Sequence, residues 1–113
     1  MDRPAPAAKK RSMNETRIPA QTCETMAEVR AAVDSIDRDL ARLIGERFRY
    51  MEAAARIKPA RDQVRDEPRK AEVIANARAN AAANGVPVAL AEALWERLVE
   101  GSIAYELDVF DQR

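Results

Sequence analysis

The sequence predicts an all-α protein, a single small domain built from three helices. The chain has 113 residues, of which only 3 are Gly and 4% are aromatic, and its abundant Ala, Glu, Arg and Leu favour helices. Apolar residues recur every three or four positions over long stretches, which is the helical period. Pro and Gly separate these stretches at only a few points.

The first 22 residues contain almost no side chains that a folded core could bury. Pro4, Pro6 and Pro19 stand there among small and charged residues, a composition typical of disordered chains. We therefore expect a disordered basic tail over residues 1–22, with Met13 as an alternative first residue, and a folded helical domain over residues 23–113.

The first predicted helix is the longest and runs from about Thr25 to Ile57. Glu28 follows Thr25 by three residues, as in a capping box, and Pro59 ends the helix. The apolar residues on one face of this helix are Val33, Ile36, Leu40, Leu43, Ile44, Met51 and Ala54 or Ala55. This spacing predicts a buried stripe.

A polar connection over residues 59–65 leads to the second helix, which Asp66 caps and which ends at Asn84-Gly85. Its apolar side consists of Val73, Ile74, Ala77 and Ala81. The third helix runs from Pro87 to about Phe110. Its inner face is predicted to comprise Ala91, Leu94, Leu98, Ser102, Tyr105 or Glu106, and Val109.

The length of the first helix predicts a homodimer. About 33 residues span about 50 Å at 1.5 Å per residue, and two short helices cannot cover so long an apolar stripe. We expect a second copy of the chain to pack against it, antiparallel, about a two-fold axis. A coiled-coil adaptor is the alternative, although charged residues interrupt the heptads that such a protein needs.

Composition excludes several classes of function. The 19 Lys and Arg balance the 19 Asp and Glu, whereas nucleic-acid binders are usually basic. His is absent and Cys23 is the single cysteine, which removes an internal disulfide, His-activated nucleophiles and common metal motifs. No apolar run is long enough to cross a membrane. We expect a cytoplasmic protein without metal or cofactor, and without nucleic-acid or membrane partners.

Arg47 and Lys58 place two cations on the apolar side of the first helix. They are eleven residues apart, three helical turns, so they share a face and are about 16 Å apart along the axis. An unpaired buried cation costs several kcal/mol, which favours either an anionic ligand or a structural ion pair. Arg30, about 25 Å before Arg47 along the helix, reaches the same small ligand only from a partner chain.

Each of these residues also has a simpler interpretation. Lys58 can interact with the dipole at the helix end, and Arg30 can be a solvated surface residue. On the third helix, Ser102 and Glu106 interrupt the apolar face. Ser102 can be a small packing residue, and Glu106 can pair with Arg47.

Taken together, these residues resemble the AroQ class of all-helical chorismate mutases over residues 23–110. The similarity comprises an Arg near the start of the first helix, an Arg in its middle, a Lys at its end, the turn RDEPR over residues 65–69 and the segment LVEGSIAYELDVF. The stretch from Cys23 to Lys58 also resembles the branch that contains isochorismate-pyruvate lyases. The resemblance implies an intertwined three-helix homodimer that rearranges chorismate to prephenate without metal or cofactor.

The resemblance also implies roles for individual residues. Arg30 from the other protomer, Arg47 and Arg69 would hold the two substrate carboxylates, and Lys58 would donate to the ether oxygen. Asp66 would accept from the ring hydroxyl. The implied catalytic residues are Lys58, Glu106 and Arg47, and the implied substrate-binding residues are Arg30, Arg47, Lys58, Asp66, Arg69, Lys70, Ser102 and Glu106.

Two positions depart from the common mutase pattern. Glu106 stands where Gln is frequent, and a carboxyl group donates a hydrogen bond only when protonated, so we expect activity to rise as the pH falls. Lys70 stands where Glu often contacts the ring hydroxyl, which leaves chorismate and isochorismate both open as substrates. The alternatives are a lyase that eliminates pyruvate from isochorismate to give salicylate, and a non-catalytic helical dimer.

Overall fold

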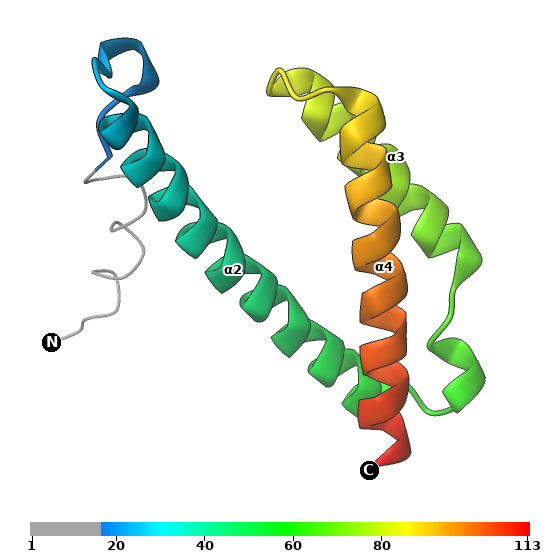
Figure 1. Ribbon diagram of the computed structural model, residues 1–113. Coiled ribbons are helices and arrows are strands. Elements are labelled where there is room, and N and C mark those ends of the chain that lie inside the picture. The colour runs from blue at the N-terminus through cyan, green and yellow to red at the C-terminus, as the bar shows by residue number, and fades with distance from the viewer. Residues whose placement is uncertain (1–16) are drawn as a thin grey trace, which may run out of the picture. The chain divides into compact units, whose positions relative to one another are not determined.

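The computed structural model describes residues 17–113, and the expected tail over residues 1–16 lies outside the described residues. Three long helices form the described chain: α2 (Met26–Ile57), α3 (Glu67–Ala83) and α4 (Val88–Asp111), with short 3-10 turns at Ala20–Thr22 and Arg61–Gln63 (Figure 1). No strand occurs in this range, so the prediction of an all-α chain with one long and two shorter helices is confirmed.

The chain divides into two compact units, and their boundary falls inside α2, between Arg47 and Phe48. The described part of the first unit contains residues 17–47, and the second contains residues 48–113. None of the helices in residues 17–113 is long and apolar enough to cross a membrane.

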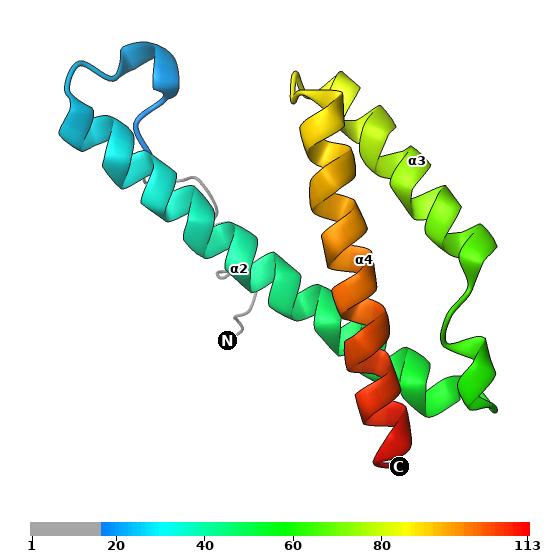
Figure 2. The ribbon, with the colours of Figure 1, turned by 45° about the vertical axis from the view of Figure 1, so that its right-hand side comes forward.

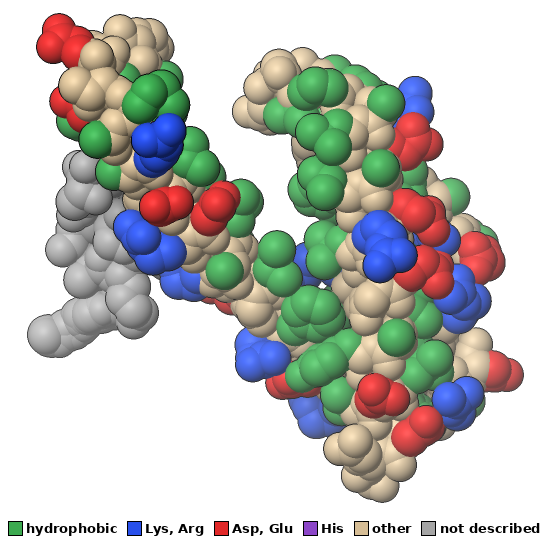
Figure 3. Space-filling view, in the orientation of Figure 1, with side chains coloured by type: hydrophobic (Ala, Val, Ile, Leu, Met, Phe, Trp, Pro, Cys, Tyr) green, Lys and Arg blue, Asp and Glu red, His purple; other side chains and the backbone are tan. Residues whose placement is uncertain are grey.

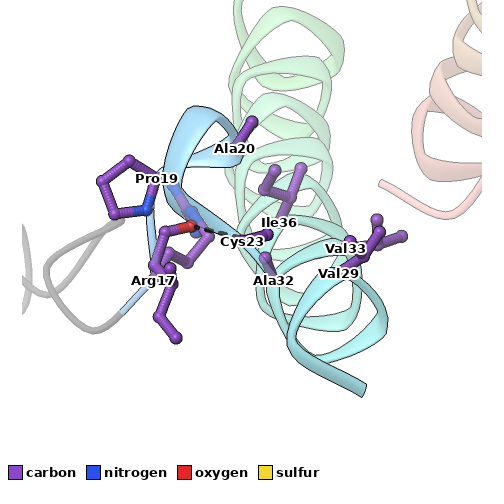
Figure 4. A pocket seen from close by; sticks show the side chains of 9 residues that line it. Arg17, Pro19, Ala20, Cys23, Val29, Ala32, Val33 and Ile36 are labelled. Carbon is purple, nitrogen blue, oxygen red and sulfur yellow. Dashed lines mark hydrogen bonds between the residues drawn. The ribbon is translucent and has the colours of Figure 1, made fainter. Parts of the chain in front are cut away.

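A short strap, residues 17–23, folds back on α2 in the first unit. Arg17 Nη1 lies 2.8 Å from Asp39 Oδ2 and donates to Ser35 Oγ at 3.1 Å. The side chains that line the hollow between the strap and α2 in Figure 4 include Arg17, Pro19, Cys23, Val29, Val33 and Ile36. Residues 17–22 therefore depart from the expected disordered tail, because a charge pair with α2 and a 3-10 turn hold them.

The start of α2 follows the predicted capping box. Thr25 Oγ1 accepts from the Glu28 amide at 3.1 Å, and Glu28 Oε1 accepts from the amides of Glu24 and Thr25 at 2.7 and 3.1 Å. These backbone donors hold the pKa of the Glu28 carboxyl below its ordinary value. The helix therefore begins at Met26, one residue after the predicted start.

The apolar stripe of the first half of α2 stays exposed within its unit. Val33, Ile36, Leu40, Leu43 and Ile44 each expose between 41% and 50% of their surface. In the space-filling view, green side chains follow α2, and others follow one edge of α4 (Figure 3). The stripe was predicted to be buried, but within the first unit the strap borders only Val33 and Ile36 and leaves both exposed.

In the second unit, α3 and α4 form an antiparallel hairpin (Figures 1 and 2). Asp66 Oδ1 accepts from the Arg69 amide at 3.0 Å and caps α3. The turn after α3 needs Gly85, whose φ of 70° lies in the left-handed region. The two helices approach closely because the buried residues Ala77, Ala81 and Ala91 are small.

The core of the second unit differs in two places from the predicted one. It is built on Val64, Val99 and Ile103, and the partly buried residues packed against these three are Val73, Ile74, Leu107 and Phe110. Val64 was assigned to a polar connection but is only 3% exposed. Leu94 was assigned to the inner face of α4 but is 53% exposed. Since α4 carries apolar residues on several sides, the packing of α3 and the 59–65 connection decides which face is buried.

Candidate active site

An ion pair between Lys58 and Glu106 is the centre of the candidate site. Lys58 follows the last residue of α2, and its amide donates to Ala54 O at 2.9 Å. Its ammonium Nζ lies 2.8 Å from Glu106 Oε2, with side-chain exposures of 29% for Lys58 and 5% for Glu106. The Lys58 ammonium also donates to Val64 O at 3.4 Å, so both α4 and the connection contact it.

The Glu106 carboxylate has acceptor capacity that the described residues do not fill. Its Oε2 is buried and receives no well-aligned hydrogen bond from residues 17–113, so the short contact with Lys58 is an ion pair without hydrogen-bond geometry. A buried carboxylate usually accepts several hydrogen bonds. The arrangement therefore leaves Glu106 able to engage a further donor, or to carry a proton itself.

Ser102 lies one helical turn before Glu106 on the same face of α4. These two are the buried polar residues in residues 17–113, each 4% exposed. Ser102 Oγ donates to Leu98 O at 2.7 Å, a bond within the helix. The prediction that these two polar residues lie on the inner face of the third helix is confirmed.

The charged residues at the start of α3 are held by other charges of the second unit. Lys70 Nζ lies 2.8 Å from Glu96 Oε2 and 2.7 Å from Glu100 Oε2. Arg65 Nη2 lies 2.7 Å from Glu100 Oε1. Arg65 and Lys70 together lower the pKa of the Glu100 carboxyl to about 2. Lys70, predicted to bind substrate, is thus engaged in a network that ties α3 to α4.

Asp66 and Arg69 sit beside that network. The Asp66 carboxylate caps α3, as described above, and Arg69 Nη1 pairs with Glu72 Oε1 at 2.8 Å on an exposed surface. Asp66 is exposed, so its remaining lone pairs face solvent. Their predicted roles in holding a carboxylate and a ring hydroxyl remain predictions.

Arg30 and Arg47 belong to the first unit. Arg30 is exposed in the second turn of α2, and Arg47 is half-buried at the boundary of the unit. Their predicted roles as ligands of the substrate carboxylates also remain predictions. Glu106 is paired with Lys58, and this pair brings together the end of α2 and the last turns of α4.

Two sets of polar contacts near the end of α2, made by Tyr105 and by Arg113, were not predicted from the sequence. Tyr105 Oη donates to Glu52 Oε2, which raises the pKa of the Tyr105 hydroxyl, and Arg49 Nη2 lies 2.9 Å from the same carboxylate oxygen. Arg113 Nη1 donates to two carbonyls of α2, those of Ala55 and Lys58. Pro59 gave a partial signal, because it has no amide to donate to the Ala55 carbonyl and another donor is therefore needed there.

The arrangement suits binding and polarisation better than covalent or metal chemistry. Lys58 supplies a cation, and Glu106 supplies a buried carboxyl group directly beside it. A lysine ammonium stabilises negative charge that develops on a bound oxygen, and the Glu106 carboxyl group donates to such an oxygen only when it is protonated. Within residues 17–113, no group of three or more His, Cys, Asp or Glu side chains could hold a metal ion.

Two comparisons relate this chain to known proteins. Isochorismate pyruvate lyase from Pseudomonas aeruginosa is 27% identical over 92 residues, an alignment that covers 81% of this chain and 91% of that protein. Residues 29–107 match the family chorismate mutase type II, and this range contains Lys58, Ser102 and Glu106. The chain is a member of the chorismate mutase type II family.

Proposed function

We propose that this protein is a chorismate mutase, which rearranges chorismate to prephenate in a cationic pocket. The observation that carries the proposal is the Lys58–Glu106 pair, in which a nearly buried carboxyl group lies 2.8 Å from a lysine ammonium. Glu106 Oε2 receives no well-aligned hydrogen bond from the described residues, so the pair keeps capacity to engage a ligand. A substrate oxygen that replaces this direct contact would receive a hydrogen bond from Lys58, and one from Glu106 once that carboxyl group is protonated.

In this mechanism the protein supplies orientation and charge, and no covalent intermediate forms. The substrate is a dianion, so Arg47, Arg69 and Arg30 of the partner subunit hold its two carboxylates in a compact conformer. As the ether bond breaks, negative charge grows on its oxygen. Lys58 Nζ and protonated Glu106 donate to that oxygen and stabilise the transition state more than the ground state.

The proposed enzyme is a homodimer with shared sites. Two exposed apolar surfaces support this assembly. One is the α2 stripe of the first unit. The other lies on the first half of α4 in the second unit, where Leu90 and Leu94 are each 53% exposed and Trp95 is 36% exposed. In a two-fold dimer each surface of one chain can cover its counterpart on the other, and Arg30 then reaches the partner's pocket.

Mixed dimers test this sharing. Chains carrying Arg30→Ala and chains carrying Lys58→Ala are each expected to be inactive alone. Co-refolded in equal amounts, they should recover about a quarter of the wild-type activity per chain, because half of the dimers then hold one intact site. The matched control combines Lys58→Ala with Arg69→Ala, both in the second unit, which should recover nothing. Equal recovery in both mixtures would refute a site that Arg30 completes from the partner.

The reaction itself is tested by offering chorismate and isochorismate separately at pH 5 and pH 7.5, and following prephenate and salicylate. We expect prephenate from chorismate, with a higher rate at pH 5 because Glu106 must be protonated to donate. Glu106→Gln donates at both pH values, so its profile should be flat and its activity at pH 7.5 should exceed that of the wild type. A flat profile in both proteins would count against the proposed role of Glu106.

Isochorismate-pyruvate lyase activity is the second candidate. It is supported by the relative from Pseudomonas aeruginosa and by Lys70. This residue pairs with Glu96 and Glu100, and it supplies an ammonium group where the common mutase pattern has a carboxylate for the ring hydroxyl. Salicylate from isochorismate, without prephenate from chorismate, would establish the lyase in place of the mutase. Neither product at either pH would leave a non-catalytic helical dimer.

A further inference from the structure

The end of the chain, just after α4, contacts the end of α2 at the residue that carries the proposed catalytic ammonium. Arg113 Nη1 donates to Ala55 O at 2.9 Å and to Lys58 O at 2.6 Å. The same guanidinium stacks on Phe110, with 3.9 Å between Cζ and the ring centroid, and Phe110 packs against the core of the second unit. Arg113 is thus anchored on one side and donates on the other.

The sequence creates the need for this donor. In an uninterrupted helix, the carbonyl of Ala55 would accept from the amide four residues later. That residue is Pro59, which has no N–H. Ala55 is 0% exposed, so water is a poor substitute partner for its carbonyl. The Arg113 guanidinium takes the place of the missing amide.

Glu106 and Arg113 both act on Lys58. Glu106 belongs to α4, and Arg113 lies two residues beyond the end of that helix. Glu106 contacts the Lys58 ammonium, and Arg113 contacts the Lys58 carbonyl. α4 and the residues that follow it therefore hold Lys58 both at the end of its side chain and at its backbone.

We infer that Arg113 is a positioning residue for Lys58, which fixes the last turn of α2 so that the ammonium is aimed at the reacting oxygen. The inference rests on the proposed function, in which Lys58 donates to that oxygen. Without the guanidinium, the Pro59 gap leaves the last turn of α2 free to fray. The Lys58 ammonium then samples a wider range of positions, which is costly because transition-state stabilisation depends on placement within a fraction of an ångström.

The test uses four variants of the full chain and two readouts. Arg113→Ala removes the donor, Arg113→Lys keeps a cation that can reach one carbonyl, and Gln112→Ala is the matched control in the same turn. Pro59→Ala restores an amide that can donate to Ala55 O. The first readout is hydrogen exchange at the Lys58 amide, which bonds to Ala54 O and needs no substrate. The second is kcat and KM with whichever substrate the protein turns over.

Arg113→Ala should accelerate exchange at Lys58 and lower kcat about 10- to 100-fold, with a smaller change in KM, since the lost interaction acts mainly in the transition state. Arg113→Lys should fall between Arg113→Ala and the wild type, and Gln112→Ala should match the wild type. In the Pro59→Ala background, Arg113→Ala should change the exchange rate at Lys58 and kcat severalfold less than it does in the wild-type background. A protein that merely became less stable would show no such rescue.

Unchanged exchange at Lys58 in Arg113→Ala would overturn the inference. Faster exchange with wild-type kcat in an active enzyme would overturn it equally, because the contact would then be structural only. If the wild type converts neither substrate, the proposed function fails, and exchange at Lys58 with its rescue by Pro59→Ala alone decides whether Arg113 positions this residue.

Discussion

Replacing Lys58 by Met should destabilise the protein far more than replacing Glu106 by Gln. Met keeps the apolar stem of Lys58 and removes its charge, which leaves the Glu106 carboxylate without its cation. That side chain is only 5% exposed, so water cannot compensate. Gln at position 106 leaves Lys58 without its anion instead, but Lys58 is 29% exposed and its flexible stem can carry the ammonium into water.

The magnitudes follow from the geometry. At 2.8 Å, the Coulomb attraction is about 6 kcal/mol at an effective dielectric constant of about 20. Part of this offsets the desolvation of the two groups. Removing one partner of a buried pair costs about 3–5 kcal/mol, which we expect for Lys58→Met at pH 7. For Glu106→Gln, we expect about 1 kcal/mol, the usual net value of one hydrogen bond.

Urea unfolding at a fixed protein concentration measures both variants at pH 7 and pH 5. In Lys58→Met, the Glu106 carboxyl group stays buried without its cation, so the deficit relative to the wild type should exceed that of Glu106→Gln. The double variant should be less destabilised than Lys58→Met alone. Equal costs for the two single variants at both pH values would refute the assignment of Glu106 as a buried charge held by Lys58.

Three further predictions concern the second unit. Arg65 and Lys70 depress the pKa of Glu100 from 4.5 to about 2, so the stability from this network is present above pH 4.5 and is lost as the pH falls towards 2; thermal unfolding of Glu100→Gln should therefore vary less over this range, and parallel profiles would contradict the network. Asp66→Ala should cost about 0.5–2 kcal/mol through the lost cap, whereas Asp66→Asn should cost less, as urea unfolding can establish. Val64→Ala should cost about 1–3 kcal/mol in the same assay, and a neutral result would mean that Val64 is not part of the core.

The helix boundaries were predictable because their causes are local. A cap depends on residues within one turn, so Thr25 with Glu28, Asp66, and Asn84-Gly85 each indicated a helix end without knowledge of the rest of the chain. The strap was missed because it depends on a pair between Arg17 and Asp39, 22 residues apart. Composition gave no sign of that distant contact.

The core and the site were predictable only in part. Apolar residues on several sides of α4 gave no basis for preferring Val99 and Ile103 over Leu94, because that choice depends on where α3 and the connection pack. Glu106 stood out as a charge on an apolar face, yet its partner Lys58 is 48 residues away, and only the fold reveals their contact. Lys70 was selected as a substrate-binding residue by resemblance, but in the structure it pairs with two carboxylates of α4, a contact that the sequence did not indicate.

The alanine contacts between α3 and α4 have a consequence for the order of folding. Ala77, Ala81 and Ala91 lie close together in sequence, so the hairpin closes over a short loop and should form in a fast, unimolecular step. The first half of α2 gains nothing from that step, because its stripe remains exposed within its unit. The first half of α2 should instead become ordered when two chains associate, which is a second-order step. Refolding should therefore show a rapid phase that is independent of protein concentration, followed by a slower phase that accelerates as the concentration rises.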